Sequence, residues 1–374
     1  MRPPPRRFER LPPQYFTDLL ARVAEAAATE GEPLLDLGRG NPEVGPPAHV
    51  VEALSESAAR PDLHGYAPFA GLPELKEAIA RRYAEVYGVE LNPRREVAVV
   101  PGTKSALVEV ALAVAERGST IVLPDPGYAD YPSAVALAAA ERGSLPVDPE
   151  PDWDAAPEER VSLLYLNFPS NPTAIAAPDG VFAAAVEYAG RTGAAILHDF
   201  AYGDLVFDGR RPASFLAEEG AQEIGVELFS MSKSYGMAGW RLGFVLGNAE
   251  IVRRVDLLQD HLRAGIFMPL QHAAIAALTG PQTSVEERRL AYERRRDRAV
   301  AALAGLEPRG EGTFFVWFRL PAGMTAERLL AESRVAVAPG DGFGERGAGW
   351  ATLSLAVPDE TFDAGVERLC RALS

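Results

Sequence analysis

Residues 230–244, Ser-Met-Ser-Lys-Ser-Tyr-Gly-Met-Ala-Gly-Trp-Arg-Leu-Gly-Phe, decide the fold class, because this stretch links one buried run to another. The run before it, 226–229, lacks the polar alternation of a half-exposed strand, and 243–246 is a candidate for a further strand. Helical stretches such as 105–115 and 181–190 separate the earlier runs. This order predicts an α/β fold with a largely parallel sheet. The remaining predicted strands are 96–100, 120–123, 161–166 and 194–197.

The two ends of the chain have a different pattern. Residues 14–29 predict an alanine-rich helix behind a proline-rich arm, and 284–303 predict a long helix with a charged, solvated face. Residues 313–320 and 350–356 predict strands of a smaller α/β unit. We therefore expect an N-terminal arm and helix that join the small domain (1–44), a large domain (45–280) and a small C-terminal domain (281–374).

Composition excludes several classes of function. The chain has 374 residues, 47% of them hydrophobic and 24% charged, as is typical of a globular protein. Its net charge of −15 argues against nucleic acid and anionic membranes as partners. No apolar run suits a membrane span, and a cytoplasmic location is expected. Cys370, the single cysteine, excludes an internal disulfide, and the five histidines have no metal-ligand spacing, so no metal is predicted.

Polar loops follow five of the predicted strands. In an open α/β sheet, ligands bind beyond the carboxyl ends of the strands, so these loops should converge on one site. Each loop alone could be ordinary turn chemistry. The loops are 101–104, 124–128, 167–173, 198–202 and 230–233.

Two of these loops carry groups that suit phosphate. Gly102-Thr103-Lys104 opens a helix directly after a strand, where unpaired N–H groups favour an anion, although it matches neither a Walker A loop nor the dinucleotide fingerprint. Ser230, Ser232 and Lys233, with Arg241 eight residues further on, add hydroxyls, an amine and a guanidinium. Two phosphate-binding segments and a spare lysine suggest a phosphorylated aldehyde held as an imine.

At this point a resemblance can be stated. The chain resembles the fold-type I, pyridoxal-phosphate-dependent aminotransferases of class I/II, above all the branch with the diaminopimelate, aspartate and alanine enzymes. The resemblance implies an aspartate-aminotransferase-like fold, pyridoxal 5'-phosphate (PLP) as cofactor, and ping-pong transfer of an amino group between a donor and a 2-oxo acid or related carbonyl compound. The segments that carry it are 66–75 (YAPFAGLPEL), 171–173 (NPT), Asp199 with Tyr202, 230–244, and 265–271 (GIFMPLQ).

The same resemblance implies the catalytic residues. Lys233 would hold the cofactor and move the α-proton as base and acid. Asp199 would keep the pyridine nitrogen protonated, and its pKa should be lowered by a nearby cation. Tyr202 and Asn171 would bind the ring oxygen. Tyr128 would stack on the ring, although Tyr131 lies near it in sequence and either could belong to the core.

The phosphate would lie at the helix start after Gly102, where the backbone can come close. Ser232 could equally bond to its own backbone. Tyr66 would reach the phosphate of a neighbouring subunit, which implies a homodimer with shared active sites. The other residues implied for the phosphate are Thr103, Lys104, Ser230 and Arg241.

The chain departs from the family pattern at the substrate end. Where the family has an arginine that grips the substrate α-carboxylate, this chain has Thr352. Gly40, like Asn171, would line the substrate site. Arg39 could replace the missing arginine or face solvent, and Arg263 is another candidate.

A second departure is Ala174, where the family usually has glycine after Asn-Pro-Thr, which suggests a less demanding backbone angle. His198 precedes Asp199, and strand alternation should turn it away from the site into the packed interior.

Three functions compete. Transamination is the leading hypothesis. A PLP-dependent lyase or decarboxylase on the same scaffold is the alternative, because of Thr352. A cofactor-dependent regulatory protein is a third, although the chain has no room for a fused DNA-binding domain.

Overall fold

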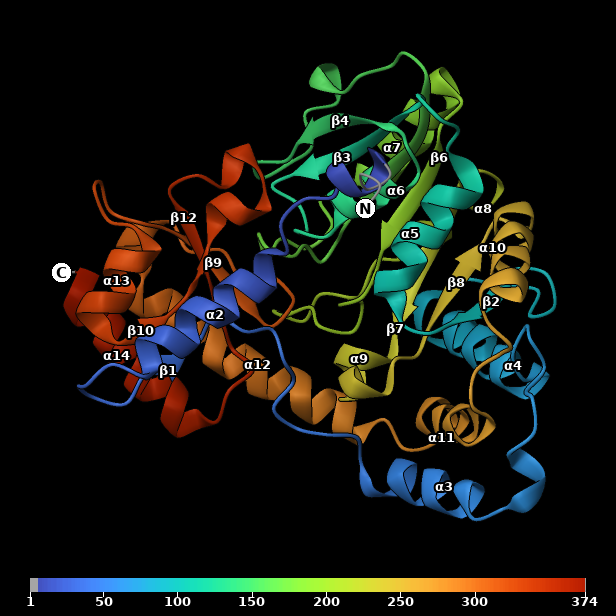
Figure 1. Cartoon of the computed structure of the whole chain (residues 1–374), viewed down its shortest axis with the longest axis horizontal. Coiled ribbons are helices and arrows are strands. Elements are labelled where there is room, and N and C mark those ends of the chain that lie inside the picture. Colours follow the sequence, from blue (N-terminus) through green and yellow to red (C-terminus); the bar gives the residue numbers. More distant parts are fainter. Residues whose placement is uncertain (1–5, 374) are drawn as a thin grey trace, which may run out of the picture.

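The computed structural model describes residues 6–373, so residues 1–5 and 374 of the expected arm and C-terminal domain lie outside the described residues. A seven-stranded sheet of order β2-β8-β7-β6-β5-β3-β4 forms its centre (Figure 1). β8 runs antiparallel to both its neighbours, β2 and β7, and the other neighbouring strands are parallel, which confirms a largely parallel α/β sheet. The strands are β2 (Val97–Val100), β3 (Thr120–Asp125), β4 (Glu141–Pro146), β5 (Val161–Leu166), β6 (Ala195–Asp199), β7 (Gly225–Ser230) and β8 (Gly243–Gly247).

The sequence did not predict β4, which pairs in parallel with β3 at the edge of the sheet. Its six residues, Glu-Arg-Gly-Ser-Leu-Pro, are half-exposed and include glycine and proline. An edge strand is hydrogen-bonded on one side only, so it tolerates residues that a central strand excludes.

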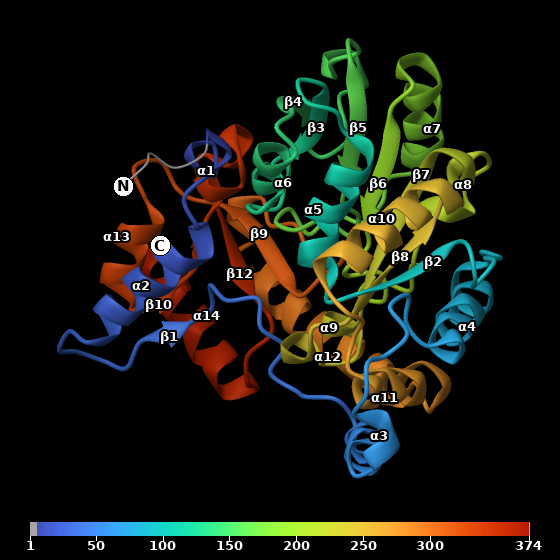
Figure 2. The ribbon, with the colours of Figure 1, turned by 45° about the vertical axis from the view of Figure 1, so that its right-hand side comes forward.

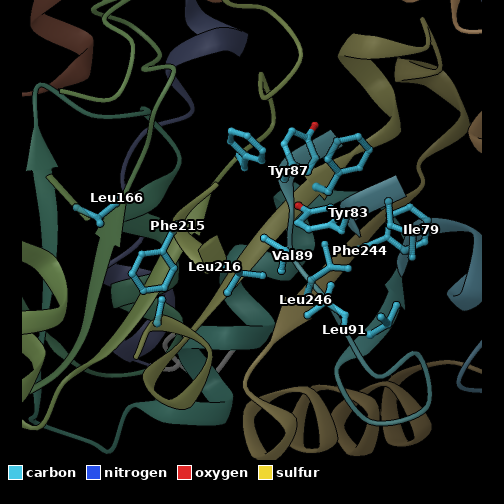
Figure 3. Packing of buried hydrophobic residues seen from close by; sticks show 14 of the residues in the cluster. Ile79, Tyr83, Tyr87, Val89, Leu91, Leu166, Phe215, Leu216, Phe244 and Leu246 are labelled. Carbon is cyan, nitrogen blue, oxygen red and sulfur yellow. The ribbon is translucent and has the colours of Figure 1, made fainter. Parts of the chain in front are cut away.

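Helices cover both faces of this sheet (Figure 2). Alternate strand residues feed two cores, as Val97 and Val99 enter one while Ala98 and Val100 enter the other. The first core, shown in Figure 3, packs Tyr83 and its neighbours against β8. Its helices are α3 (Ala48–Ala58), α4 (Pro73–Arg82), α7 (Val181–Thr192), α8 (Ala221–Ile224) and α11 (Met268–Thr279); those of the second are α5 (Thr103–Val114), α6 (Tyr131–Leu137) and α10 (Ala249–Leu262).

The C-terminal part forms a second, antiparallel sheet of order β11-β12-β9. Its strands are β9 (Phe315–Arg319), β11 (Ala338–Pro339) and β12 (Trp350–Ser354). The helices of this part are α12 (Thr283–Ala302), α13 (Ala326–Ser333) and α14 (Asp359–Leu373).

Residues 15–36 lie beside this C-terminal part (Figure 1), whereas residues 6–9 contact α6 of the large part. Strand β1 (Leu35–Asp36) pairs in parallel with β10 (Val335–Ala336). Helices α1 (Arg6–Glu9) and α2 (Tyr15–Ala27) precede it, and Leu19 and Val23 of α2 pack against Trp317 and Trp350. Both ends of the chain therefore build one wall of the molecule.

Candidate active site

A cavity of about 410 Å³ lies at the carboxyl ends of the parallel strands. The five polar loops that follow β2, β3, β5, β6 and β7 all reach it, as their positions in sequence predict. The sequence-predicted residues that line it are Gly40, Thr103, Lys104, Tyr128, Asn171, Asp199, Tyr202, Ser230, Ser232, Lys233, Arg241 and Thr352.

Lys233 lies on the short helix α9 (Met231–Ser234), which Ser230 caps by accepting a 3.2 Å bond from the Ser232 amide. The Lys233 amine donates to the carbonyl of Gly40 at 3.1 Å. Burial, with the positive charge of Arg241, lowers the pKa of Lys233 to about 8, although Asp199 opposes the shift. A larger fraction of this amine is therefore neutral, and hence nucleophilic, than for an ordinary lysine.

Asp199, at the end of β6, is buried. Its Oδ2 accepts a 3.0 Å bond from the Tyr131 hydroxyl, and its Oδ1 accepts one of 3.3 Å from the Ala201 amide. Burial raises the pKa of Asp199 above its usual value, against the lowering effect of these bonds and of Lys233. The sequence-based expectation of a lowered pKa was wrong in direction, because desolvation outweighs the nearby cation.

Asn171 lies beside Tyr202 and lowers the pKa of its hydroxyl, but burial has the larger effect and raises that pKa. The Asn171 Oδ1 is buried and has no partner among the described residues. Tyr128 lines the cavity, and its ring lies 5.8 Å from that of Phe16. Tyr131 lies behind Tyr128 and is 1% exposed. Tyr128 therefore lines the cavity, whereas Tyr131 belongs to the core.

Gly102 adopts a left-handed φ of +89° just before α5, whose first turn has no side-chain cap. A Cβ on Gly102 would lie 2.3 Å from Nη2 of Arg241, so glycine lets this guanidinium lie against the helix start. Arg241 also has a positive φ of 59° and donates to the Ala238 carbonyl at 2.9 Å. Lys104 lies 2.8 Å from the buried Asp130 carboxylate, which balances its charge.

The opposite end of the cavity is different in character. Thr352, in the middle of β12, is 1% exposed, and its hydroxyl has no hydrogen-bond partner among the described residues. Glycines and apolar side chains surround this end. They are Phe16, Gly38, Gly40, Phe315, Ala338 and Phe343.

Four candidate residues do not line this cavity: Gly102, described above, and Arg39, Arg263 and Tyr66. Arg39 ion-pairs with Asp36 and keeps a side chain that is 59% exposed, so the structure does not bring it to the site. Arg263 pairs with Glu109 at 2.8 Å. Tyr66 is 87% exposed, which leaves its predicted role in a neighbouring subunit as a prediction.

His198 is packed and hydrogen-bonded, as strand alternation predicts. It is fully buried, and its Nδ1 lies 2.8 Å from a carboxylate oxygen of Glu227. The expectation for Ala174 was wrong. This residue keeps a left-handed φ of +56°, because its carbonyl accepts bonds from the amides of Glu311 and Gly312 and fixes the turn.

Sequence reasoning missed several lining residues. Asn167 could have been found, because it lies in a polar loop of the site. Its side chain holds the Asp199 carbonyl at 2.8 Å and the Asn171 amide at 2.7 Å. The others are small or apolar and gave no signal of their own: Phe16, Gly38, Leu107, Ala201, Ala238, Phe315, Ala338 and Phe343.

Comparisons with known proteins agree with this geometry. A family model for "Aminotransferase class I and II" matches residues 32–369. The chain belongs to the class I and II aminotransferases. Members of this family use PLP, and the chain is a transaminase. No comparison favours the lyase or decarboxylase alternative.

Relatives of this aminotransferase match over nearly its whole length. It is 40% identical to an L-glutamine–4-(methylsulfanyl)-2-oxobutanoate aminotransferase of Bacillus subtilis, across 97% of this chain and 94% of that protein. It is 36% identical to an LL-diaminopimelate aminotransferase of Moorella thermoacetica, across 98% of both. A substrate-bound structure of BacF from Bacillus subtilis aligns with a TM-score of 0.92 at 36% identity, across 99% of this chain and 98% of that one.

Membrane-spanning helices and groups of metal ligands are both absent from the described residues. In the described part of the chain, no helix is long and apolar enough to cross a membrane. Within residues 6–373, His, Cys, Asp and Glu side chains form no group that could bind a metal ion.

Proposed function

We propose that this aminotransferase binds PLP in the 410 Å³ cavity and uses Lys233, Asp199 and Tyr202 as its catalytic residues. The observation that carries the proposal is the meeting, in one cavity, of a lysine with a lowered pKa and a buried aspartate. A lysine amine that is partly neutral can attack an aldehyde, and a buried carboxylate can hold a proton on a ring nitrogen.

The polar groups present fit such a cofactor. The Asn171 amide nitrogen and the Tyr202 hydroxyl can both donate to a ring oxygen, and both side chains line the cavity. Gly102 has no Cβ, so the Arg241 guanidinium can lie against the start of α5, whose first turn has no side-chain cap and offers its amides to a phosphate. Arg241 adds a charge-assisted contact, with Thr103, Ser230 and Ser232 around it.

When bound, PLP supplies an electron sink that stabilises negative charge at the substrate α-carbon. The chain supplies the proton handling. Lys233 would take the proton from the substrate α-carbon as a base and would give it back as an acid. Its lowered pKa, about 8, suits both steps near neutral pH. The Tyr131 hydroxyl donates a hydrogen bond to Asp199, which holds the carboxylate in position.

The unit that we propose is a homodimer. Tyr66 is exposed, as are Phe69 at 47% and Phe267 at 50%, and large exposed aromatic side chains are typical of a surface that another chain covers. In this dimer Tyr66 would contact the phosphate of the neighbouring site. The cytoplasmic location and the domain boundaries at 44 and 280 stay predictions from the sequence.

The proposal is tested on purified protein. Reduction with borohydride in the presence of PLP should attach the cofactor to one lysine, and peptide mass spectrometry should find it on Lys233. Lys104→Ala should still form this adduct, whereas Lys233→Ala should not. A wild-type protein without any adduct would overturn the proposal. Where the adduct forms on Lys233, a change in the absorption spectrum of the bound cofactor on addition of an amine would identify that amine as a donor.

A further inference from the structure

Two of the cationic side chains that line the cavity lie at the start of α5, and the third lies against Gly40. Within the described part of the chain, the cationic side chains of the cavity are Lys104, Lys233 and Arg241. Lys104 is balanced by Asp130, and Arg241 lies against Gly102 at the start of α5. Lys233 donates to the Gly40 carbonyl. Under the proposed function, all of them serve the cofactor.

Thr352 has an apolar partner on each neighbouring strand. On β12, Trp350 and Thr352 share a face, and Thr352 is registered with Ala338 on one side and Trp317 on the other. Trp350, Ala338, Trp317 and Phe343 belong to one apolar cluster. The Thr352 hydroxyl, buried and without a partner, is thus a lone polar group in an apolar wall.

Three further arginines have other partners. Arg39 pairs with Asp36, and Arg263 pairs with Glu109. Arg309 packs its guanidinium 4.7 Å above the Trp350 ring and lies 2.6 Å from an Asp148 oxygen. None of these side chains lines the cavity.

A carboxylate is expensive to remove from water unless a cation or several donors receive it, and one hydroxyl is not enough. A neutral group that both donates and accepts suits a threonine hydroxyl. We propose that the preferred substrates of this cavity carry a neutral polar group, a hydroxyl or a carboxamide, in place of the carboxylate beside the reacting carbon. The amino forms of such substrates are 2-amino alcohols and α-amino amides.

This inference rests on the proposed function and keeps its chemistry. The C–N bond of the 2-amino alcohol is replaced by C=O, giving a hydroxyketone or hydroxyaldehyde. Over the two half-reactions, the amino group of the donor would be exchanged for the oxygen of a second carbonyl compound, which becomes the amine. Water is consumed in one half-reaction and released in the other, so no external oxidant is needed. Thr352 acts by selecting which substrate binds.

The test compares L-alanine, L-alaninol and L-alaninamide as donors to the PLP-loaded enzyme. The rate of cofactor spectral change per unit of donor concentration is measured for each. We expect the neutral donors to react at least tenfold faster than alanine. A faster reaction with alanine would overturn the inference while leaving transamination intact, whereas a protein without the Lys233 adduct would overturn the proposed function itself.

Two variants test the role of Thr352. Thr352→Arg should raise the rate with alanine relative to alaninol by about ten- to a hundredfold, because it adds a bidentate cation. Thr352→Val keeps the shape and removes the hydroxyl, so it should lower the rate with alaninol relative to 2-aminobutane, which has a methyl in place of the hydroxyl. An unchanged ratio in Thr352→Val would overturn the assignment.

An equilibrium measurement complements the rates. 2-Methylalanine and 2-methylalaninamide have no α-hydrogen to lose, so calorimetry reports their binding alone. We expect the amide to bind the wild-type enzyme at least tenfold more tightly, and Thr352→Arg to reverse the order. Tighter binding of 2-methylalanine to the wild type would contradict the inference, even if Thr352→Arg did not fold.

Discussion

The hydroxyl of Tyr131 donates a hydrogen bond of 3.0 Å to Oδ2 of Asp199. Both residues are buried, and this bond lowers the pKa of a carboxyl that burial alone would raise further. Tyr131 lies at the start of α6, far from Asp199 in sequence, and its packing beneath Tyr128 brings it into place. The ionised form of Asp199 thus depends on a residue that does not line the cavity.

Tyr131→Phe should therefore shift the pH dependence of transamination. Without the hydroxyl, the pKa of Asp199 rises, because the ionised carboxylate loses a hydrogen bond. The acid-side midpoint of the pH profile should therefore move up by about one pH unit. The pH profile of kcat measures this shift. Tyr165→Phe is the matched control, because that buried hydroxyl donates to the Leu107 carbonyl instead. Equal profiles for Tyr131→Phe and wild type would contradict the prediction.

Adduct formation at Lys233 should follow its own titration. The pKa is lowered to about 8, so the amine is neutral above that pH and protonated below it. The rate at which borohydride traps pyridoxal on cofactor-free protein should rise with pH and level off above about pH 8. Pyridoxal lacks the phosphate, so this measurement isolates the amine.

Arg241→Met should move that midpoint toward the ordinary lysine value, because the positive charge of Arg241 helps to lower the pKa. The control is Arg253→Met, since Arg253 is exposed on α10 and pairs with Glu250. A midpoint that stays near pH 8 in Arg241→Met would assign the shift to burial alone.

Gly102→Ala should weaken the binding of PLP. The new Cβ would lie 2.3 Å from Nη2 of Arg241 and would displace this guanidinium. The phosphate would then lose one or more charge-assisted contacts with Arg241. We expect the Kd for PLP to rise about ten- to a hundredfold. Gly88→Ala is the control, because Gly88 has a similar φ of +70° but open space around it. If both variants weaken PLP binding equally, backbone strain is the cause, and the proposed role of the Gly102–Arg241 contact in phosphate binding is contradicted.

His198→Gln should lower stability more than activity. His198 and Glu227 are fully buried, and Glu227 also accepts bonds from Tyr83 and Ser214. Disturbing this network should cost about 1–3 kcal/mol and lower the melting temperature by a few degrees. The kcat should stay within about threefold. A large loss of kcat at an unchanged melting temperature would show that His198 acts in the chemistry.

The central strands and the polar loops could be predicted from sequence, because buried parallel strands and turn residues leave local patterns. β4 could not be predicted, since its half-exposed edge position permits Glu141, Arg142 and Pro146. Its register comes from pairing with β3 rather than from its own residues.

For the site, recognition of the family supplied the residue roles, and the structure supplied the neighbours. Phe16 and Phe343 line the cavity only because distant segments fold against it, which no local pattern reveals. The Asp199 pKa also depends on burial, a quantity that residue type alone does not give. The positive φ of Ala174 is imposed by its bonds to residues 311 and 312.

The pairing of β1 with β10 makes the aminotransferase modular. The substrate end of the cavity draws on residues from the first forty and on those from 315 to 352, while the cofactor end draws on residues 103 to 241. A chimera that exchanges both termini of two relatives, and leaves the middle in place, should therefore transplant substrate selectivity as a unit. Exchange of one terminus alone would pair β1 of one relative with β10 of the other. The two segments that line the substrate end of the cavity would then not match.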